Sequence, residues 1–189
     1  MLEALPPRVE RVLDLGTGDG RMLALVCSHH PDARGVGIDS SPPMLSRVAE
    51  RFAGDTRIEL ADHDLRQALA VSGPFDVVVS GLAIHHLEDQ RKQALSREVH
   101  SLLRPGGVFA NLDLVTSATA EQHERFRRAI GSAEDDPADL LADLCPQLAW
   151  LRDAGFQDVD CPFKWMELAL IVAVKPDGPA DLDPSLSTI

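Results

Sequence analysis

Apolar and polar residues alternate along this chain with two different periods, and segments of the two kinds follow one another. Short apolar runs, typical of strands buried in a sheet, are separated by segments whose apolar residues recur every three or four positions, as on one face of a helix. The runs that predict strands are residues 11–16, 33–41, 56–64, 74–81 and 108–115. The segments that predict helices are residues 19–31, 41–53 and 89–107. This order predicts a parallel sheet with helices on both faces.

Proline, glycine and serine mark the ends of these helices. Ser41 can cap the helix at 41–53, and the two prolines that follow it suit a first helical turn. The helix at 89–107 closes with Pro-Gly-Gly at 105–107, which predicts that it ends just before the fifth strand.

The pattern changes after residue 115. Residues 116–149 are polar with helical spacing, a further helix ends at Gly155, and two strands at about 157–163 and 166–174 can pair as a hairpin. A tail at 176–189, rich in proline, aspartate and serine, predicts disorder. A chain of 189 residues suits a single domain, which we assign to residues 1–175.

Charge and composition narrow the classes of partner. The net charge of −12 argues against a nucleic-acid backbone, because phosphate binding needs clustered lysine and arginine. Three well-separated cysteines without a C-x-x-C pair are typical of free thiols in a reducing compartment. The first residues carry no apolar leader, and the longest apolar run is too short to span a bilayer. The sequence therefore predicts a cytoplasmic protein that does not enter a membrane.

Three glycines at alternate positions follow the first strand, in the sequence DLGTGDG. In an open parallel sheet, this loop is the usual place for a ligand. A dinucleotide-binding loop would have glycine or alanine where this chain has Arg21, which argues against a nicotinamide cofactor. Asp39, at the end of the second strand, can accept hydrogen bonds from both hydroxyls of a ribose. Asp14 would repel a pyrophosphate and favours a positively charged ligand.

Five stretches in order resemble motifs of the class I S-adenosylmethionine-dependent methyltransferases. They are VLDLGTGDGR, GIDSSPPML, ELADHDL, FDVVVSGLAIHHLED and LLRPGGVF, and together they span roughly residues 12–115. WLRDAGFQDV and the two strands after it resemble the last helix and the closing hairpin of that family. The resemblance implies an α/β fold, a Rossmann-like α/β/α sandwich around a doubly wound seven-stranded sheet, mostly parallel with an antiparallel last strand. It also implies S-adenosylmethionine as the cofactor and S-adenosylhomocysteine as the product.

The same resemblance implies a set of cofactor-binding residues. They are Asp14, Gly16, Thr17, Gly18, Asp39, Ser40, Met44, Asp62, His63, Ser80 and Leu82. The residues of the glycine loop would line the methionine part of the cofactor, and Asp39 would hold the ribose hydroxyls. Ser40 and Met44 would pack near the adenine.

Four further positions complete this implied site. Asp62 would accept a hydrogen bond from the adenine amino group, with His63 beside the ring. Ser80 and Leu82, after the fourth strand, would flank the methionine end and face the acceptor.

Methyl transfer from a sulfonium needs orientation and, for some acceptors, a base. His85 and His86 follow the fourth strand, close to where the methyl group should lie, and a histidine is suited to accept a proton near neutral pH. His85 is the candidate base, and Asp113, at the end of the fifth strand, is a second catalytic candidate. The alternatives are that the histidines cap or pack against the next helix, and that Asp113 is a solvated loop carboxylate.

The histidine pairs do not predict a metal site, and the acidic run does not predict a binding site. The pairs His29-His30 and His85-His86 are sequence neighbours that point apart on a helix, and no clustered cysteine and histidine spacing occurs, so no metal is expected. The acidic run at 132–139 is typical of a solvated surface.

Three functional hypotheses follow. The first is a methyltransferase acting on an O, N or C atom of a small molecule, with residues 116–149 as a substrate lid. The second is a non-catalytic protein that binds S-adenosylmethionine and pairs with another chain. It is motivated by the first motif, which begins almost at once, where the family has further helices that close over the cofactor. A second subunit, as in a homodimer, could cover the cofactor instead. The third, an NAD-binding oxidoreductase, is disfavoured by Arg21 and by the predicted hairpin.

Overall fold

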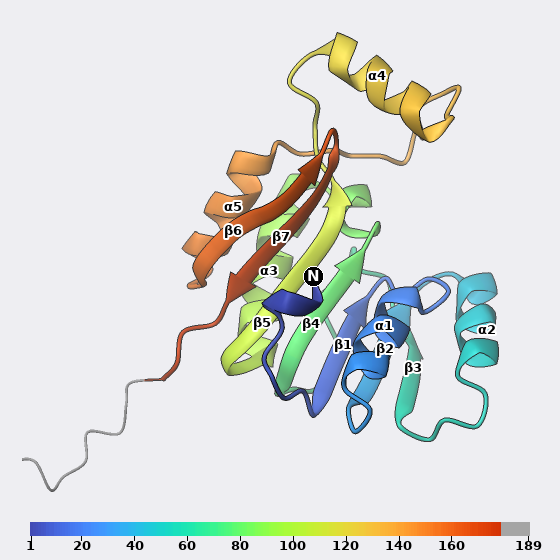
Figure 1. Ribbon diagram of the computed structural model, residues 1–189, viewed down its shortest axis with the longest axis vertical. Helices are drawn as coiled ribbons and strands as arrows, with labels where there is room; N and C mark the ends of the chain where they lie inside the picture. Colours follow the sequence, from blue (N-terminus) through green and yellow to red (C-terminus); the bar gives the residue numbers. More distant parts are fainter. Residues whose placement is uncertain (179–189) are drawn as a thin grey trace, which may run out of the picture.

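Seven strands form one sheet in the computed structural model, which describes residues 1–178 (Figure 1). The strands are β1 (Arg11–Leu15), β2 (Arg34–Asp39), β3 (Ile58–Asp62), β4 (Phe75–Gly81), β5 (Leu103–Leu114), β6 (Gln157–Trp165) and β7 (Leu168–Val174). Their order across the sheet is β3-β2-β1-β4-β5-β7-β6. Strands β1 to β5 pair in parallel, and β7 is antiparallel to both of its neighbours. The predicted doubly wound, mostly parallel sheet is confirmed.

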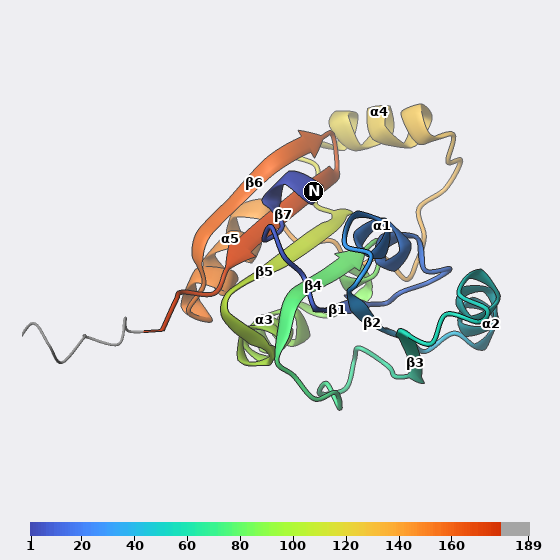
Figure 2. The same cartoon turned by 60° about the horizontal axis from the view of Figure 1, so that its bottom comes forward.

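Helices lie on both faces of this sheet. They are α1 (Arg21–His29), α2 (Pro42–Arg51), α3 (Asp89–Leu102), α4 (Ala120–Ile130) and α5 (Leu144–Asp153), with short 3-10 helices η1 (Leu2–Ala4) and η2 (Ile84–His86). The helices α1 and α2 lie on one face together with η1, and α3 and α5 lie on the other (Figure 1, Figure 2). The helix α4 lies beyond the carboxyl ends of the strands, away from both layers (Figure 1).

The strand β4 shows why the apolar pattern predicted a buried sheet. Val78 packs into the core with α3 and α5, whereas Val77 and Val79 pack into the core with α1. Successive side chains of a strand point to opposite faces, so a continuous valine run is buried only when both faces are covered. All three valines are fully buried. Polar groups on the loops after β1, β2 and β4 are thereby fixed on a rigid edge.

Two details of the prediction were wrong. The third predicted helix ends at Leu102, and the strand after it begins at Leu103, so Pro-Gly-Gly at 105–107 lies within β5. Leu103 pairs with Phe75 of β4, and the register shifts before Val77, which accommodates the extra residues as an irregularity of the strand. Ser41 occupies the N-cap position of α2, but its side chain makes no capping hydrogen bond.

The segment 116–149 is helical in two parts. Thr119 caps α4 by accepting a hydrogen bond from the Gln122 amide at 3.2 Å, and Gly131, in the left-handed conformation, ends that helix. An irregular stretch at 131–143 then returns the chain to α5.

The predicted tail falls largely outside the described residues, which end at 178. All three cysteines are free, with Cys145 exposed. Within residues 1–178, no helix has both the length and the apolar character needed to cross a bilayer.

Candidate active site

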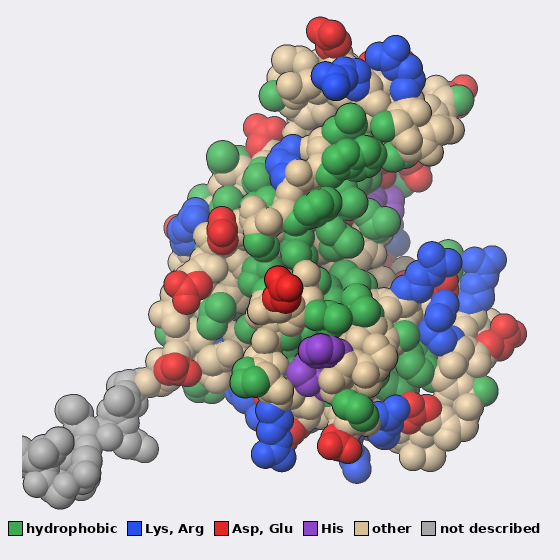
Figure 3. Space-filling view, in the orientation of Figure 1, with side chains coloured by type: hydrophobic (Ala, Val, Ile, Leu, Met, Phe, Trp, Pro, Cys, Tyr) green, Lys and Arg blue, Asp and Glu red, His purple; other side chains and the backbone are tan. Residues whose placement is uncertain are grey.

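The predicted cofactor residues gather at one edge of the sheet, where β1, β2, β3 and β4 end. The parallel register places Leu15 beside Ser80 and Asp39 beside Asp62. The molecule is hollowed at this edge, between α4 on one side and α1 with α2 on the other (Figure 3). Open α/β sheets bind ligands at this position, outside the carboxyl ends of the strands where the strand order reverses.

Asp14 is the most deeply buried of these residues, with no exposed side-chain surface. Its Oδ2 accepts hydrogen bonds from the Thr17 hydroxyl at 2.7 Å and from the Leu23 amide at 3.2 Å. Its Oδ1 is buried without a hydrogen-bond partner. Burial raises the pKa of Asp14 to about 7, against the opposing effect of those hydrogen bonds. A carboxylate held in this way fixes the glycine loop and is stabilised by a nearby cation.

The three glycines of the loop are needed for different reasons. A Cβ on Gly16 would lie 2.3 Å from the Cβ of Ala83, and one on Gly20 would lie 2.6 Å from Val48. A Cβ on Gly18 would meet nothing within 4 Å. All three have positive φ angles, which glycine adopts without strain. Packing of the protein therefore explains Gly16 and Gly20, and only Gly18 presents bare backbone to open space.

Asp39 links this loop to the end of β2. Its Oδ2 accepts a hydrogen bond from the Gly18 amide at 2.8 Å, and its Oδ1 accepts one from the Ser41 amide at 2.8 Å. A carboxylate oxygen can accept two hydrogen bonds, so each oxygen keeps one site for a ligand hydroxyl. Asp39 is half-buried, and its position beside the bare face of Gly18 suits a ribose.

The residues implied for the adenine end lie next to Asp39. Asp62 is exposed, and His63 is half-buried, with its amide donating to the Asp39 carbonyl at 3.0 Å. The His63 Nε2 is buried without a hydrogen-bond partner. Ser40 is exposed and Met44 is half-buried. These side chains could line a ring on the outer side of the loop.

The two residues implied for the acceptor side differ from each other. The hydroxyl of Ser80 is fully buried and donates to the Leu15 carbonyl at 2.8 Å, so it joins β4 to β1. Leu82 is 54% exposed and has a φ angle of 54°. A non-glycine residue in this conformation is strained and is held there by its surroundings, a feature often found at functional sites. Leu82 therefore presents an exposed apolar side chain directly after the end of β4.

The structure brings the two catalytic candidates into contact. The His85 amide donates to Asp113 Oδ2 at 3.0 Å, and the His85 Nδ1 is hydrogen-bonded to Asp113 Oδ1. Both side chains are buried. Burial alone would lower the pKa of His85, but the hydrogen bond and charge of Asp113, with the charge of Asp139, raise it above its usual value. Asp113 thus orients the ring, with Nε2 facing away from it.

Sequence reasoning missed Asp139. Its Oδ1 lies 3.3 Å from His85 Nε2 and 3.4 Å from His86 Nδ1, although it belongs to the acidic run that we interpreted as solvated surface. The Asp139 side chain is 23% exposed. Because His85 and Asp139 are far apart in the chain, no local pattern indicates this contact. His85, His86 and Asp139 also form a group that could hold a metal ion, so the expected absence of metal stays a prediction.

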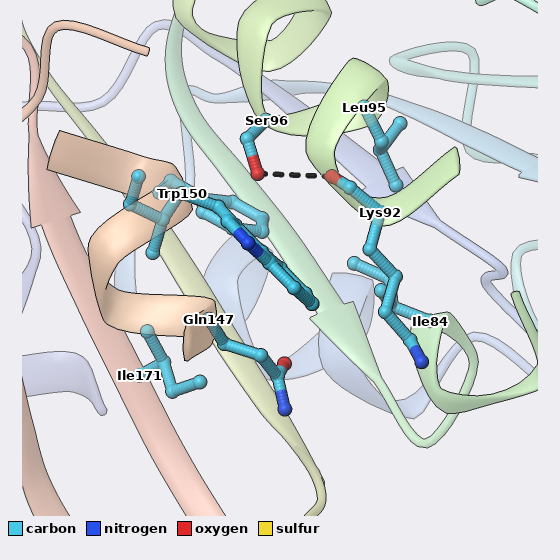
Figure 4. A pocket seen from close by; sticks show the side chains of 9 residues that line it. Ile84, Lys92, Leu95, Ser96, Gln147, Trp150 and Ile171 are labelled. Carbon is cyan, nitrogen blue, oxygen red and sulfur yellow. Dashed lines mark hydrogen bonds between the residues drawn. The ribbon is translucent and has the colours of Figure 1, made fainter. Parts of the chain in front are cut away.

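Two buried polar side chains hold the segment that carries Asp139. The Lys92 Nζ donates to the Leu140 carbonyl and, at 3.1 Å, to Asp89. The Gln147 amide donates to the Ala142 carbonyl at 3.0 Å. Both side chains extend toward the same end of a small cavity of about 20 Å³ between α3, α5 and the sheet (Figure 4). They anchor residues 140–142 and thereby position Asp139.

A second histidine connects α4 to the sheet. His123 Nδ1 lies 2.7 Å from Glu167 Oε1, in the turn between β6 and β7, and His123 Nε2 lies 2.9 Å from Asp135. These two carboxylates raise the pKa of His123. Glu167 is 1% exposed, so its buried charge is stabilised mainly by this contact.

A family described as a methyltransferase domain matches residues 12–107. The chain belongs to the class I S-adenosylmethionine-dependent methyltransferase family. It is 39% identical over 117 residues to an uncharacterized methyltransferase of Mycobacterium tuberculosis, a match that covers 61% of this chain and 57% of that protein. The chain thus spans somewhat more than half the length of that methyltransferase.

Two other similar proteins match a larger share of this methyltransferase than the Mycobacterium protein does. It is 27% identical over 186 residues to the carboxy-S-adenosyl-L-methionine synthase of Klebsiella pneumoniae, covering 87% of this chain and 74% of that enzyme. An O-methyltransferase family protein from Burkholderia thailandensis has the same fold, with a TM-score of 0.74 at 20% identity, covering 91% of this chain and 52% of that one.

Proposed function

We propose that this chain transfers a methyl group from S-adenosylmethionine to an O, N or C atom of a small-molecule acceptor. The observation that carries the proposal is the bare backbone of Gly18 beside the half-free carboxylate of Asp39. Family membership favours S-adenosylmethionine over a nicotinamide cofactor. The net charge of −12 disfavours a nucleic-acid acceptor.

The residues present fit this cofactor. Asp39 would accept hydrogen bonds from the ribose hydroxyls, and Gly18 leaves room for the ligand to approach the backbone. The unpartnered Oδ1 of Asp14 would be stabilised by a positively charged methionine part. Met44 and His63 would line the adenine, with Ser40 and Asp62 at its edge.

When bound, S-adenosylmethionine supplies a methyl group on a positively charged sulfur, and the carbon–sulfur bond breaks as the acceptor takes the methyl, leaving S-adenosylhomocysteine. For an acceptor that must lose a proton, we assign that proton to His85 Nε2. Asp113 holds Nδ1 and stabilises the positive charge that the ring gains. In the structure the Asp139 carboxylate lies beside His85 Nε2. The acceptor would therefore displace this carboxylate or bind between it and the ring. Leu82 and Ser80 would flank the reacting groups.

The test is turnover with labelled S-adenosylmethionine and a panel of small acceptors, with the cofactor product identified by mass spectrometry. Label in the acceptor together with S-adenosylhomocysteine supports methyl transfer. Cofactor binding without any turnover across the panel would favour the alternative of a binding-only protein. A cofactor that gains a carboxyl group would favour the activity named for the Klebsiella relative.

A homodimer in which the second subunit covers the cofactor remains a prediction. The molecular mass of the protein in solution tests whether it forms a dimer.

The helix α4 and the loop at 131–143 are our candidates for a substrate lid, because they lie over the carboxyl ends of the strands (Figure 1).

A further inference from the structure

A large pocket lies beneath α4, separate from the glycine loop. Its volume is about 680 Å³, which is in the usual range for small-molecule sites. Its walls come from the end of β5, the inner side of α4, the loop after α4 and the turn between β6 and β7. The lining includes Leu114, Phe126, Ile130, Glu134, Asp136 and Asp139.

This pocket adjoins the histidine that we propose as the base. Asp139 lines the pocket and lies 3.3 Å from His85 Nε2. Leu114, also in the lining, follows Asp113 directly on β5. A molecule in the pocket that displaced the Asp139 carboxylate would therefore meet His85.

The lining combines an apolar part with a surplus of negative charge. Four large apolar side chains contribute: Leu114, Phe126, Ile130 and Leu141. Five carboxylates contribute, against one arginine and one histidine. An apolar wall with a few charged groups is the usual composition of a ligand pocket, and here the charged groups are predominantly acidic.

The two basic residues are already paired with carboxylates. Arg127 lies 2.9 Å from Glu124 and 3.4 Å from Asp135. His123 bridges Asp135 and the buried Glu167. Of the other three lining carboxylates, Asp139 faces the rings of His85 and His86, whereas the exposed Glu134 and Asp136 form no ion pair with any residue that the structure describes. The charge left over in the pocket is therefore negative.

We infer that the pocket binds the methyl acceptor and that the acceptor carries a protonated amine on an apolar body. This inference rests on the proposed function and specifies its substrate class. The apolar body would lie against Phe126 and Ile130, and the ammonium group would face Glu134, Asp136 and Asp139. An acceptor with a carboxylate would be repelled by the same groups. The ammonium is a recognition group, and the atom that receives the methyl group need not be this nitrogen.

The experiment compares matched probes that share a body and differ in charge. Tryptamine, 3-ethylindole and indole-3-propionate form one set, and octylamine, octanol and octanoate form another. Binding to the full chain saturated with S-adenosylhomocysteine is measured by NMR titration at low ionic strength. We expect each amine to bind at least about fivefold more tightly than its carboxylate partner, the size of effect given by one or two partly exposed ion pairs.

Variants separate the pocket from the rest of the surface. The double variant Glu134→Gln with Asp136→Asn should reduce amine binding and leave the neutral probes unchanged. Glu121→Gln, an exposed acid on α4 outside the lining, is the matched control and should change neither. Three results would overturn the inference. They are equal binding of carboxylates and amines, no binding of the amines, and amine binding that the double variant leaves unchanged. Binding of S-adenosylhomocysteine is read in the same samples, so failure of the proposed function would be seen separately, as loss of that binding.

Discussion

Asp113 holds His85 through two hydrogen bonds, one to the backbone amide and one to the ring, at the adjacent carboxyl ends of β5 and β4. The pair is buried, and only the Nε2 side of the ring faces the segment that lines the large pocket. This arrangement fixes the tautomer of the histidine and aims one nitrogen toward the acceptor side.

We expect Asp113→Asn to reduce kcat by about 10²-fold for an acceptor that must lose a proton, because the amide no longer stabilises the charged ring. Asp113 raises the pKa of His85, and the base is active only when deprotonated. The acid limb of the rate profile should therefore lie above pH 6.5 in the wild type and move to lower pH in the variant. The profile of kcat/KM against pH measures this. An unmoved acid limb would show that His85 is not the base.

The protonation of Asp14 should make the free energy of unfolding depend on pH. Its pKa is raised from 3.8 to about 7, so the folded state binds a proton that the unfolded state releases between these values. The free energy of unfolding should therefore fall by up to about 4 kcal/mol through this group alone as pH rises from about 4 to about 8, and stay level above that. Asp14→Asn removes this contribution. Urea denaturation of both proteins across this range isolates it as a difference, and parallel curves would contradict the account.

The glycines of the loop should respond differently to alanine. Gly16→Ala should cost about 2–4 kcal/mol of unfolding free energy, because the new Cβ would overlap Ala83 and the φ angle is positive. Gly18→Ala should cost only about 1 kcal/mol, since its Cβ meets nothing, but should weaken S-adenosylhomocysteine binding. Denaturation and calorimetry on the two variants give both numbers. Equal losses of stability would argue against the open face of Gly18.

The contact between His123 and Glu167 should hold α4 at low pH more firmly than at high pH. Because the pKa of His123 is raised, its stabilising charge is fully present below the unfolded value of about 6.5 and is lost as pH rises through the folded value. Glu167→Gln should accelerate amide exchange in α4 below that pH, with little change in the strands. Hydrogen exchange by mass spectrometry, corrected for the intrinsic effect of pH, makes the comparison, and Glu121→Gln is the control. Exchange in α4 that matches the wild type would show that this contact does not hold the helix.

The sequence predicted those features of the fold and site that depend on a local pattern of residues. The valines of β4 and the loop at Gly18 follow from period and spacing, and Asp39 follows from its position after a strand. The contact of His85 with Asp139 could not be found in this way, because an acidic run gives no sign of which member will face inward. The end of the helix before β5 was misplaced because Pro-Gly-Gly is compatible with both a helix stop and an irregular strand.

The central claim is that the edge formed by Gly18 and Asp39 holds S-adenosylmethionine. Isothermal titration of S-adenosylhomocysteine into the wild type and into Asp39→Ala tests it most directly, with the melting temperature of each protein as the check on folding. We expect saturable binding with one site per chain, weakened at least about tenfold by the substitution, as for the loss of hydrogen bonds to a charged group. No binding to the wild type, or equal affinity in a folded Asp39→Ala, would contradict the account.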